Sequence, residues 1–200
     1  MAFKSFARLS PRNKGSIIGQ IHKLIKYYGD FFCIRERPYL RDLSEKDGNI
    51  YWIAEGANSL IAIALVEPEY VFTIADVVLK SVGYLISKKP GYMDRLLQHI
   101  WSDLDNSSII LFSKPSLATH ISLNELNLTE LNATELASFF PQFADYKTTY
   151  FNVHETLSEG LKRRGYNIYL RITEDDEKKI LPHYPEFIEF LNEKKLKTKE

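Results

Sequence analysis

The stretch Tyr84–Leu97 constrains the fold most, because its hydrophobic period changes across a glycine turn. Residues 84–86 form a β-prone apolar run, residues 88–91 (Lys-Lys-Pro-Gly) are typical of a turn, and a helical stripe follows. The pattern predicts a strand, a basic turn and a helix in succession. The first turn of a helix offers N–H groups and a positive dipole end to a phosphate. The stretch therefore predicts an anion site at Lys88–Met93, with an ordinary connection and solvated lysines as the alternative.

Hydrophobic periodicity along the rest of the chain predicts a mixed α/β fold. Strands 50–54 and 60–66 flank a glycine-containing loop, which is typical of an antiparallel hairpin, and residues 67–69 (Glu-Pro-Glu) are expected to end it. Because helices and strands do not alternate strictly, we expect a largely antiparallel sheet flanked by helices. The predicted helices are 10–29, 39–43, 91–103, 134–140, 155–164 and 185–195, and the predicted strands are 3–9, 50–54, 60–66, 70–79, 84–86, 108–112, 146–153 and 166–171.

Length and composition allow either one large domain or a domain with an appendage. The chain has 200 residues, of which 44% are hydrophobic and 13% aromatic, enough to bury a substantial core. We predict a main domain at residues 1–172 and an extension at 173–200, in which the charged run 174–177 breaks the chain before a final helix. The apolar face of that helix predicts docking on the main domain or on a partner chain, and consists of Tyr184, Phe187, Ile188 and Leu191.

Charge and cysteine content exclude several classes of function. Lysine plus arginine equals aspartate plus glutamate at 26 each, so no net field draws the chain to nucleic acid or to an acidic membrane. Cys33 is the only cysteine, and the five histidines lack metal-ligand spacing, so we predict no metal site. The sequence has neither an 18-residue apolar run nor the apolar core of a signal peptide at its start, which predicts a cytoplasmic protein.

The order of these elements resembles the GNAT superfamily of acyl-CoA N-acyltransferases. In that family two helices precede a β-hairpin, a long strand, a phosphate loop that opens a helix, then a strand, a helix and a closing strand. The loop has the form Arg/Gln-x-x-Gly-x-Gly/Ala, followed by a Leu-Leu pair. Lys88 takes the basic position, Gly91 takes the first glycine, and Leu96-Leu97 is the pair. The resemblance covers residues 10–171 and rests mostly on element order.

The resemblance implies an acyl-CoA co-substrate, such as acetyl-CoA, and an amine-bearing small molecule or protein as acceptor. The amine would attack the thioester directly, which requires a base. Asp76, within predicted strand 70–79, and Glu55, in the hairpin turn, are the candidates. Burial would raise the pKa of a carboxylate in such a strand, whereas the alternative places Asp76 on a solvent-facing side. The implied acyl-CoA site consists of Val78, Leu79, Lys88, Lys89, Gly91, Tyr92 and Met93.

Two positions differ from the family pattern and support an alternative function. Met93 stands where the loop has a second small residue, so its side chain is expected to narrow the phosphate site. Leu161 stands where many members carry a tyrosine that protonates the departing thiolate. The alternative is a GNAT-fold binding or regulatory protein without transfer activity, and a homodimer is open in either case. RNA contact through Lys88, Lys89 and residues 162–164 is a third option, which the neutral net charge disfavours.

Overall fold

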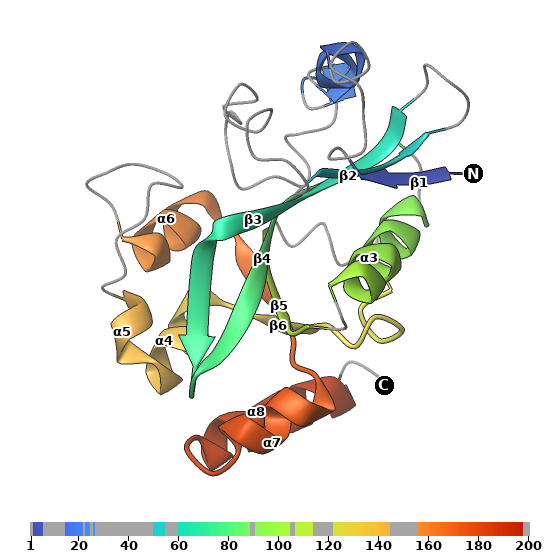
Figure 1. Cartoon of the computed structure of the whole chain (residues 1–200). Coiled ribbons are helices and arrows are strands. Elements are labelled where there is room, and N and C mark those ends of the chain that lie inside the picture. The colour runs from blue at the N-terminus through green and yellow to red at the C-terminus, as the bar shows by residue number, and fades with distance from the viewer. Residues whose placement is uncertain are drawn as a thin grey trace.

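In the computed structural model of the chain, the residues that are described form seven strands in one mixed sheet (Figure 1). The structure describes residues 2–5, 15–21, 23, 24, 26, 50–54, 60–88, 91–104, 107–113, 122–144 and 156–197. The strands are β1 (Ala2–Ser5), β2 (Ile50–Ala54), β3 (Leu60–Ile74), β4 (Val77–Ser87), β5 (Ile109–Ser113), β6 (Thr129–Leu131) and β7 (Asn167–Arg171). Their order in the sheet is β1-β2-β3-β4-β5-β7-β6. All neighbours pair antiparallel except β4 and β5, so the predicted mixed α/β fold with a largely antiparallel sheet is confirmed.

Helices cover both faces of this sheet. They are α3 (Tyr92–Asp103), α4 (Ala133–Phe139), α5 (Pro141–Ala144), α6 (Leu157–Arg164), α7 (Glu174–Ile180) and α8 (Pro185–Lys197). Residues 15–21, 23, 24 and 26 are also helical, in agreement with the predicted helix 10–29. In Figure 1, α3 lies on one side of the sheet, α4, α5 and α6 lie on the other, and α7 and α8 lie below.

The hydrophobic core is divided into two clusters by the strands themselves. In β5, Ile109 and Leu111 belong to the cluster built on α3, whereas Ile110 and Phe112 belong to the cluster under α4–α8. Side chains alternate between the faces of a strand, so a strand buried on both faces must be apolar throughout. All five residues of β5 are buried. This explains the continuous apolar run at residues 109–112.

The C-terminal helix docks on the main domain, as its apolar face predicts. The Phe187, Ile188 and Leu191 side chains are all within the larger core cluster, and Phe187 is fully buried. Its ring meets the Phe139 and Phe140 rings with centroids 5.3 and 4.8 Å apart. Residues of the predicted extension therefore complete the same core as the residues that precede them.

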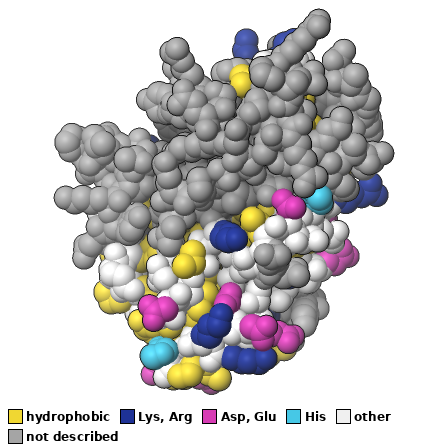
Figure 2. Space-filling view, viewed as in Figure 1, with side chains coloured by type: hydrophobic (Ala, Val, Ile, Leu, Met, Phe, Trp, Pro, Cys, Tyr) yellow, Lys and Arg dark blue, Asp and Glu magenta, His cyan; other side chains and the backbone are white. Residues whose placement is uncertain are grey.

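Figure 2 shows acidic and basic side chains interspersed over the lower part of the molecule, where α7 and α8 lie.

The predicted strand 70–79 is wrong. It is interrupted by a turn at Ala75 and Asp76, both of which have a positive φ, of 48° and 64°. Two consecutive residues in this conformation form the tight turn that joins two antiparallel strands, here β3 and β4. Such turns normally contain asparagine or glycine, and Ala-Asp gives no comparable signal. Asp76 is thus an exposed turn residue and not part of a buried strand.

Two predicted interruptions are also corrected. Residues 67–69 do not end a strand, because β3 continues through them with an irregular register between Glu67 and Val71. Pro68 lies in this bulge, where the ladder hydrogen bond that proline cannot donate is dispensable. The charged run 174–177 is not a break but the first turn of α7, where Thr173 caps the helix and carboxylates favour its positive dipole end. The predicted helix 39–43 and strand 146–153 lie outside the described residues.

A polar network joins α7 to the sheet. The buried Ser108 hydroxyl donates to Asp176 Oδ2 at 2.7 Å and accepts from the Thr173 backbone N–H at 3.0 Å. Lys179 Nζ lies 2.8 Å from the other Asp176 oxygen. Burial raises the pKa of Asp176, but hydrogen bonds from Lys179, Ser108 and Thr173 outweigh it, so the pKa lies below its ordinary value of 3.8. The ionised carboxylate therefore stabilises the folded state.

We expect Asp176→Asn to lower the free energy of unfolding at neutral pH by about 1.5–3 kcal/mol, the usual contribution of hydrogen bonds to a charged group. Because the folded-state pKa is depressed, the difference in unfolding free energy between the wild type and the variant has its full size at pH values well above 3.8. The difference is lost as the pH falls below that value. Urea unfolding at several pH values measures it. The matched control is Asp175→Asn. The Asp175 side chain is 87% exposed and pairs with the exposed Lys178, so this variant should change stability by less than about 0.5 kcal/mol. Equal losses in the two variants would contradict the expectation.

Candidate functional site

The turn between β4 and α3 is built as the sequence predicts. Gly91 precedes the helix with a φ of 78°, a left-handed conformation that favours glycine. A Cβ added at Gly91 would meet no atom within 4 Å, so the backbone conformation and not crowding requires glycine. Within the described part of the chain, no side-chain hydrogen bond caps this end of α3. The exposed Lys88 precedes the turn, and Lys89 lies outside the described residues. The turn therefore presents an uncapped, positively polarised helix end next to a basic side chain.

The parallel strands β4 and β5 separate on their way to this turn. They pair only from Lys80 to Val82 on β4 and from Ile109 to Leu111 on β5. Both strands continue beyond that point, β4 to Ser87 and β5 to Ser113. Within the described residues, the edge of β4 from 83 to 87 is therefore not paired with β5. In open α/β sheets, ligands bind at the carboxyl ends of parallel strands, which is where this opening lies.

The Met93 side chain is directed into the core. It is 1% exposed and belongs to the cluster that α3 forms with Val82, Leu111 and Tyr169. The Met93 side chain therefore packs beneath the helix, in contrast to the expectation that it narrows the phosphate site at the β4–α3 turn. Asp94, also in the first turn, accepts hydrogen bonds from the backbone N–H and hydroxyl of Ser122, both at 3.1 Å. Tyr92 is half-buried, and the Arg95 guanidinium lies 5.7 Å from its ring centroid.

The other predicted site residues are not brought to this turn. Val78 and Leu79 lie at the start of β4, the end next to Asp76, whereas the turn follows the last residue, Ser87. At about 3.3 Å per residue, Val78 and Ser87 are separated by roughly 30 Å of strand. The Val78 side chain is 48% exposed, and the Leu79 side chain is buried in the larger core cluster. Glu55 lies outside the described residues.

Leu161 and Tyr166 are core residues. Leu161, at the position for which the resemblance implies a tyrosine, is fully buried in the larger cluster, and Tyr166 is 7% exposed in the same cluster. Tyr169 of β7 pairs with Leu111, where β4 and β5 separate. Tyr169 is also fully buried, and its hydroxyl lies 3.4 Å from Glu130 Oε1. Burial and the nearby carboxylate raise its pKa, so the phenol stays protonated.

We expect Asp76→Gly to raise the free energy of unfolding by about 0.5–1 kcal/mol, because glycine adopts the observed φ of 64° without strain. Asp76→Val should lower it by about 1–2 kcal/mol, because a β-branched residue is strained there. Chemical denaturation of both variants measures whether each substitution raises or lowers the free energy of unfolding. If the glycine and valine variants were equally stable, the left-handed turn would be refuted.

Sequence reasoning missed a second polar site, at the start of β5. An open pocket of about 630 Å³ lies there, lined by Ser107, Asn127, Arg171, Ile172, Thr173, Glu174, Asp175 and Asp176. The sequence identified Arg171 only as the last residue of a strand. No local pattern could find the pocket, because its residues come from three distant parts of the chain.

The fold and the turn define a mixed α/β protein with an uncapped helix end at the opening of its sheet. The chain matches no protein-family model, and no curated protein shows significant sequence similarity to it. Among the described helices, none has the length and apolar character that a membrane span needs. Nor do three or more metal-ligating side chains gather anywhere in the described ranges.

Proposed function

We propose that this chain is an acyl-CoA-dependent N-acyltransferase of GNAT-like fold, with the coenzyme phosphates at the β4–α3 turn. The observation that carries the proposal is the opening between β4 and β5, which leads from Val82 to the turn at Gly91. The element order supports it as well. Helical residues 15–21, 23, 24 and 26, the β2–β3 hairpin, the long strand β4, the turn, α3, β5, α6 and β7 occur in the order of that family, with β6, α4 and α5 between β5 and α6.

In this proposal the backbone N–H groups of the first turn of α3 and the Lys88 ammonium group bind the pyrophosphate. The pantetheine arm runs back along the unpaired edge of β4, and the thioester lies near Val82, where pairing with β5 begins. The acceptor amine attacks the thioester carbonyl, the C–S bond breaks, and coenzyme A leaves as a thiolate. The amine proton passes to a base or to water. A thiolate is stable enough near neutral pH to leave without a proton donor, so Leu161 is compatible with transfer.

The first test is binding. Acetyl-CoA and free coenzyme A at about 100 times their dissociation constant should add roughly 2.7 kcal/mol of stability, measured as a thermal shift. Pantetheine, which lacks the pyrophosphate, should give a much smaller shift. Lys88→Gln should weaken coenzyme A binding by about tenfold, and the matched control Lys197→Gln, at the far end of α8, should not. No shift with millimolar acetyl-CoA or coenzyme A would refute the proposal.

The second candidate function is a coenzyme A-binding protein without transfer activity. Two observations favour this non-catalytic function. Leu161 is fully buried in the core, and Asp76 lies at the end of β4 that is opposite the β4–α3 turn. Release of coenzyme A thiol with a panel of primary amines separates the two functions. Turnover that falls by about 10²-fold or more in kcat/KM in Asp76→Asn would restore Asp76 as the base. Coenzyme A binding without turnover for any amine would establish the non-catalytic function.

A further inference from the structure

The pocket at the start of β5 holds an arginine with an unsatisfied donor. The Arg171 guanidinium lies 4.2 Å from the Trp101 ring centroid, so the indole covers one of its faces. Its Nη1 atom is buried and has no hydrogen-bond partner. Among the described residues, no carboxylate pairs with Arg171. An unsatisfied buried donor of a charged group is costly, and such a group normally has an acceptor. The Nη1 atom of Arg171 therefore lacks a hydrogen-bond acceptor among the described residues.

Two further features indicate what kind of acceptor is missing. The indole Nε1 of Trp101, the residue on which Arg171 stacks, is also buried without a partner. The pKa of Arg171 is lowered, and burial is the cause. No neighbouring carboxylate among the described residues therefore compensates the guanidinium charge. A planar, stacked guanidinium with free donors is suited to a carboxylate or phosphate.

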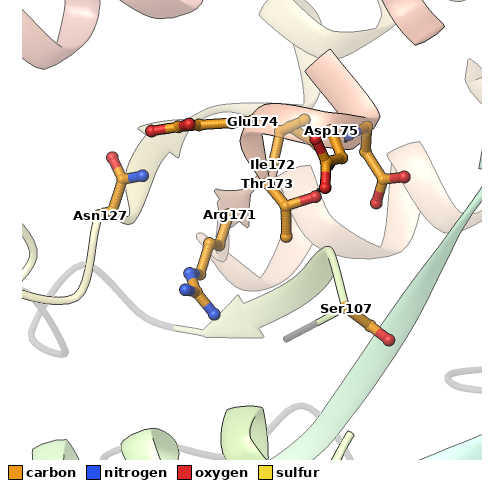
Figure 3. Close-up of a pocket in the computed structure, with 8 residues that line it drawn as sticks. Ser107, Asn127, Arg171, Ile172, Thr173, Glu174 and Asp175 are labelled. Carbon is orange, nitrogen blue, oxygen red and sulfur yellow. Dashed lines mark hydrogen bonds between the residues drawn. The ribbon is translucent and has the colours of Figure 1, made fainter. Parts of the chain in front are cut away.

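The acidic side chains of the pocket decide between these anions. Asp176 is bound by Ser108 and Lys179, and Asp175 pairs with Lys178. Glu174 is exposed and has no partner among the described residues. In Figure 3 the Arg171 side chain points away from α7, whereas the Glu174 side chain points in a different direction. Both residues line the pocket, as does Asn127. The pocket thus has one uncompensated positive and one uncompensated negative group, and its acidic wall would repel a phosphate dianion.

We infer that this pocket binds a small zwitterion, with a carboxylate on Arg171 and an ammonium group on Glu174, as in the head group of an α-amino acid. The Asn127 amide, which also lines the pocket, supplies a further donor and acceptor for either group. A volume of about 630 Å³ is within the range of small-molecule sites and leaves space for a side chain beyond the head group.

This site is distinct from the proposed coenzyme site. Trp101 lies ten residues after Gly91 along α3, which corresponds to about 15 Å at 1.5 Å per residue. Ser107 precedes β5 and Thr173 follows β7, so the pocket lies at the amino end of β5, whereas the β4–β5 opening lies at its carboxyl end. The inference of a zwitterion site therefore does not depend on the proposed acyl transfer.

The test titrates the full-length chain with glycine, acetate, methylamine and inorganic phosphate. The indole N–H signal of Trp101, assigned with Trp101→Phe, is followed by NMR. We expect a saturable shift with glycine, about tenfold weaker binding of acetate, and no saturable shift with methylamine or phosphate.

Matched variants identify the two charges. Glu174→Gln should weaken glycine binding by about tenfold and leave acetate binding unchanged, and Arg171→Lys should weaken both. Glu186→Gln, an exposed glutamate of α8, is the control and should bind glycine as the wild type does. Glu174 is exposed, so its variant tests the inference even if Arg171→Lys does not fold. The inference is overturned if no probe saturates, if acetate or phosphate binds as tightly as glycine, or if Glu174→Gln binds glycine unchanged.

Discussion

Replacing Leu191 by alanine is expected to lower the free energy of unfolding by about 2–5 kcal/mol. Leu191 is 2% exposed and lies in the larger core cluster, among residues of α4, α5 and the sheet. The substitution removes buried methyl groups and leaves a cavity in a core that is packed from several elements. Urea unfolding followed by circular dichroism measures the loss.

The same helix supplies the control. Leu196 is 66% exposed, so Leu196→Ala removes the same atoms from a site in contact with water. We expect a change of less than about 0.5 kcal/mol. If the two substitutions had equal effects, α8 would not be docked on the core, and the completion of the core by residues 180–191 would be refuted.

Leu161→Tyr has the second large expected effect. Many members of the superfamily that the sequence resembles carry a tyrosine at this position, as the acid for the departing thiolate. The structure predicts a loss of about 1–3 kcal/mol from overpacking, with a further cost if the buried hydroxyl finds no partner, because Leu161 is fully buried.

Leu161→Met conserves volume and is the matched control, with an expected loss below about 1.5 kcal/mol. Thermal unfolding and, where transfer is detected, kcat/KM are measured on both variants. A tyrosine variant that is as stable as the methionine variant would mean that the position has space for a ring, and would reopen the question of an acid there.

The elements that the sequence predicts well are those whose local signals agree with one another. Helix α6 has an apolar stripe, a Thr156–Glu159 capping box and a left-handed glycine at position 165. Helix α3 follows Gly91 as expected, and β5 and β7 have the apolar patterns of buried strands. In each case periodicity, helix ends and burial favour the same structure.

The elements that it misses are those in which tertiary context overrides local preference. The turn at residues 75–76 has no glycine or asparagine, so only the pairing of β3 with β4 imposes it. Strand β6 has three residues, too few for a period to be seen, and is held by its pairing with β7. Helix α7 begins with four carboxylates that resemble a solvated linker, and its cap and the bond from Ser108 stabilise it.

The candidate sites divide in the same way. The phosphate turn is local, so a strand, a glycine and a helix start can be predicted from adjacent residues. The zwitterion pocket depends on Trp101 and Arg171, which are 70 residues apart in sequence and meet only when α3 packs on β7. Neither residue has a neighbour in sequence that marks it as part of a site.

The docking of α8 on Phe140 also determines when the protein can finish folding on the ribosome. Phe187 is synthesised 47 residues after Phe140, and translation adds about 5–20 residues per second. For roughly 2–9 seconds the nascent chain thus leaves exposed the aromatic surface of Phe139 and Phe140 that Phe187 later covers, whereas Phe72, which packs on Phe140 and Phe143, is already synthesised. That surface is where we expect a general chaperone to bind the growing chain, and where aggregation would begin if α8 were delayed or altered.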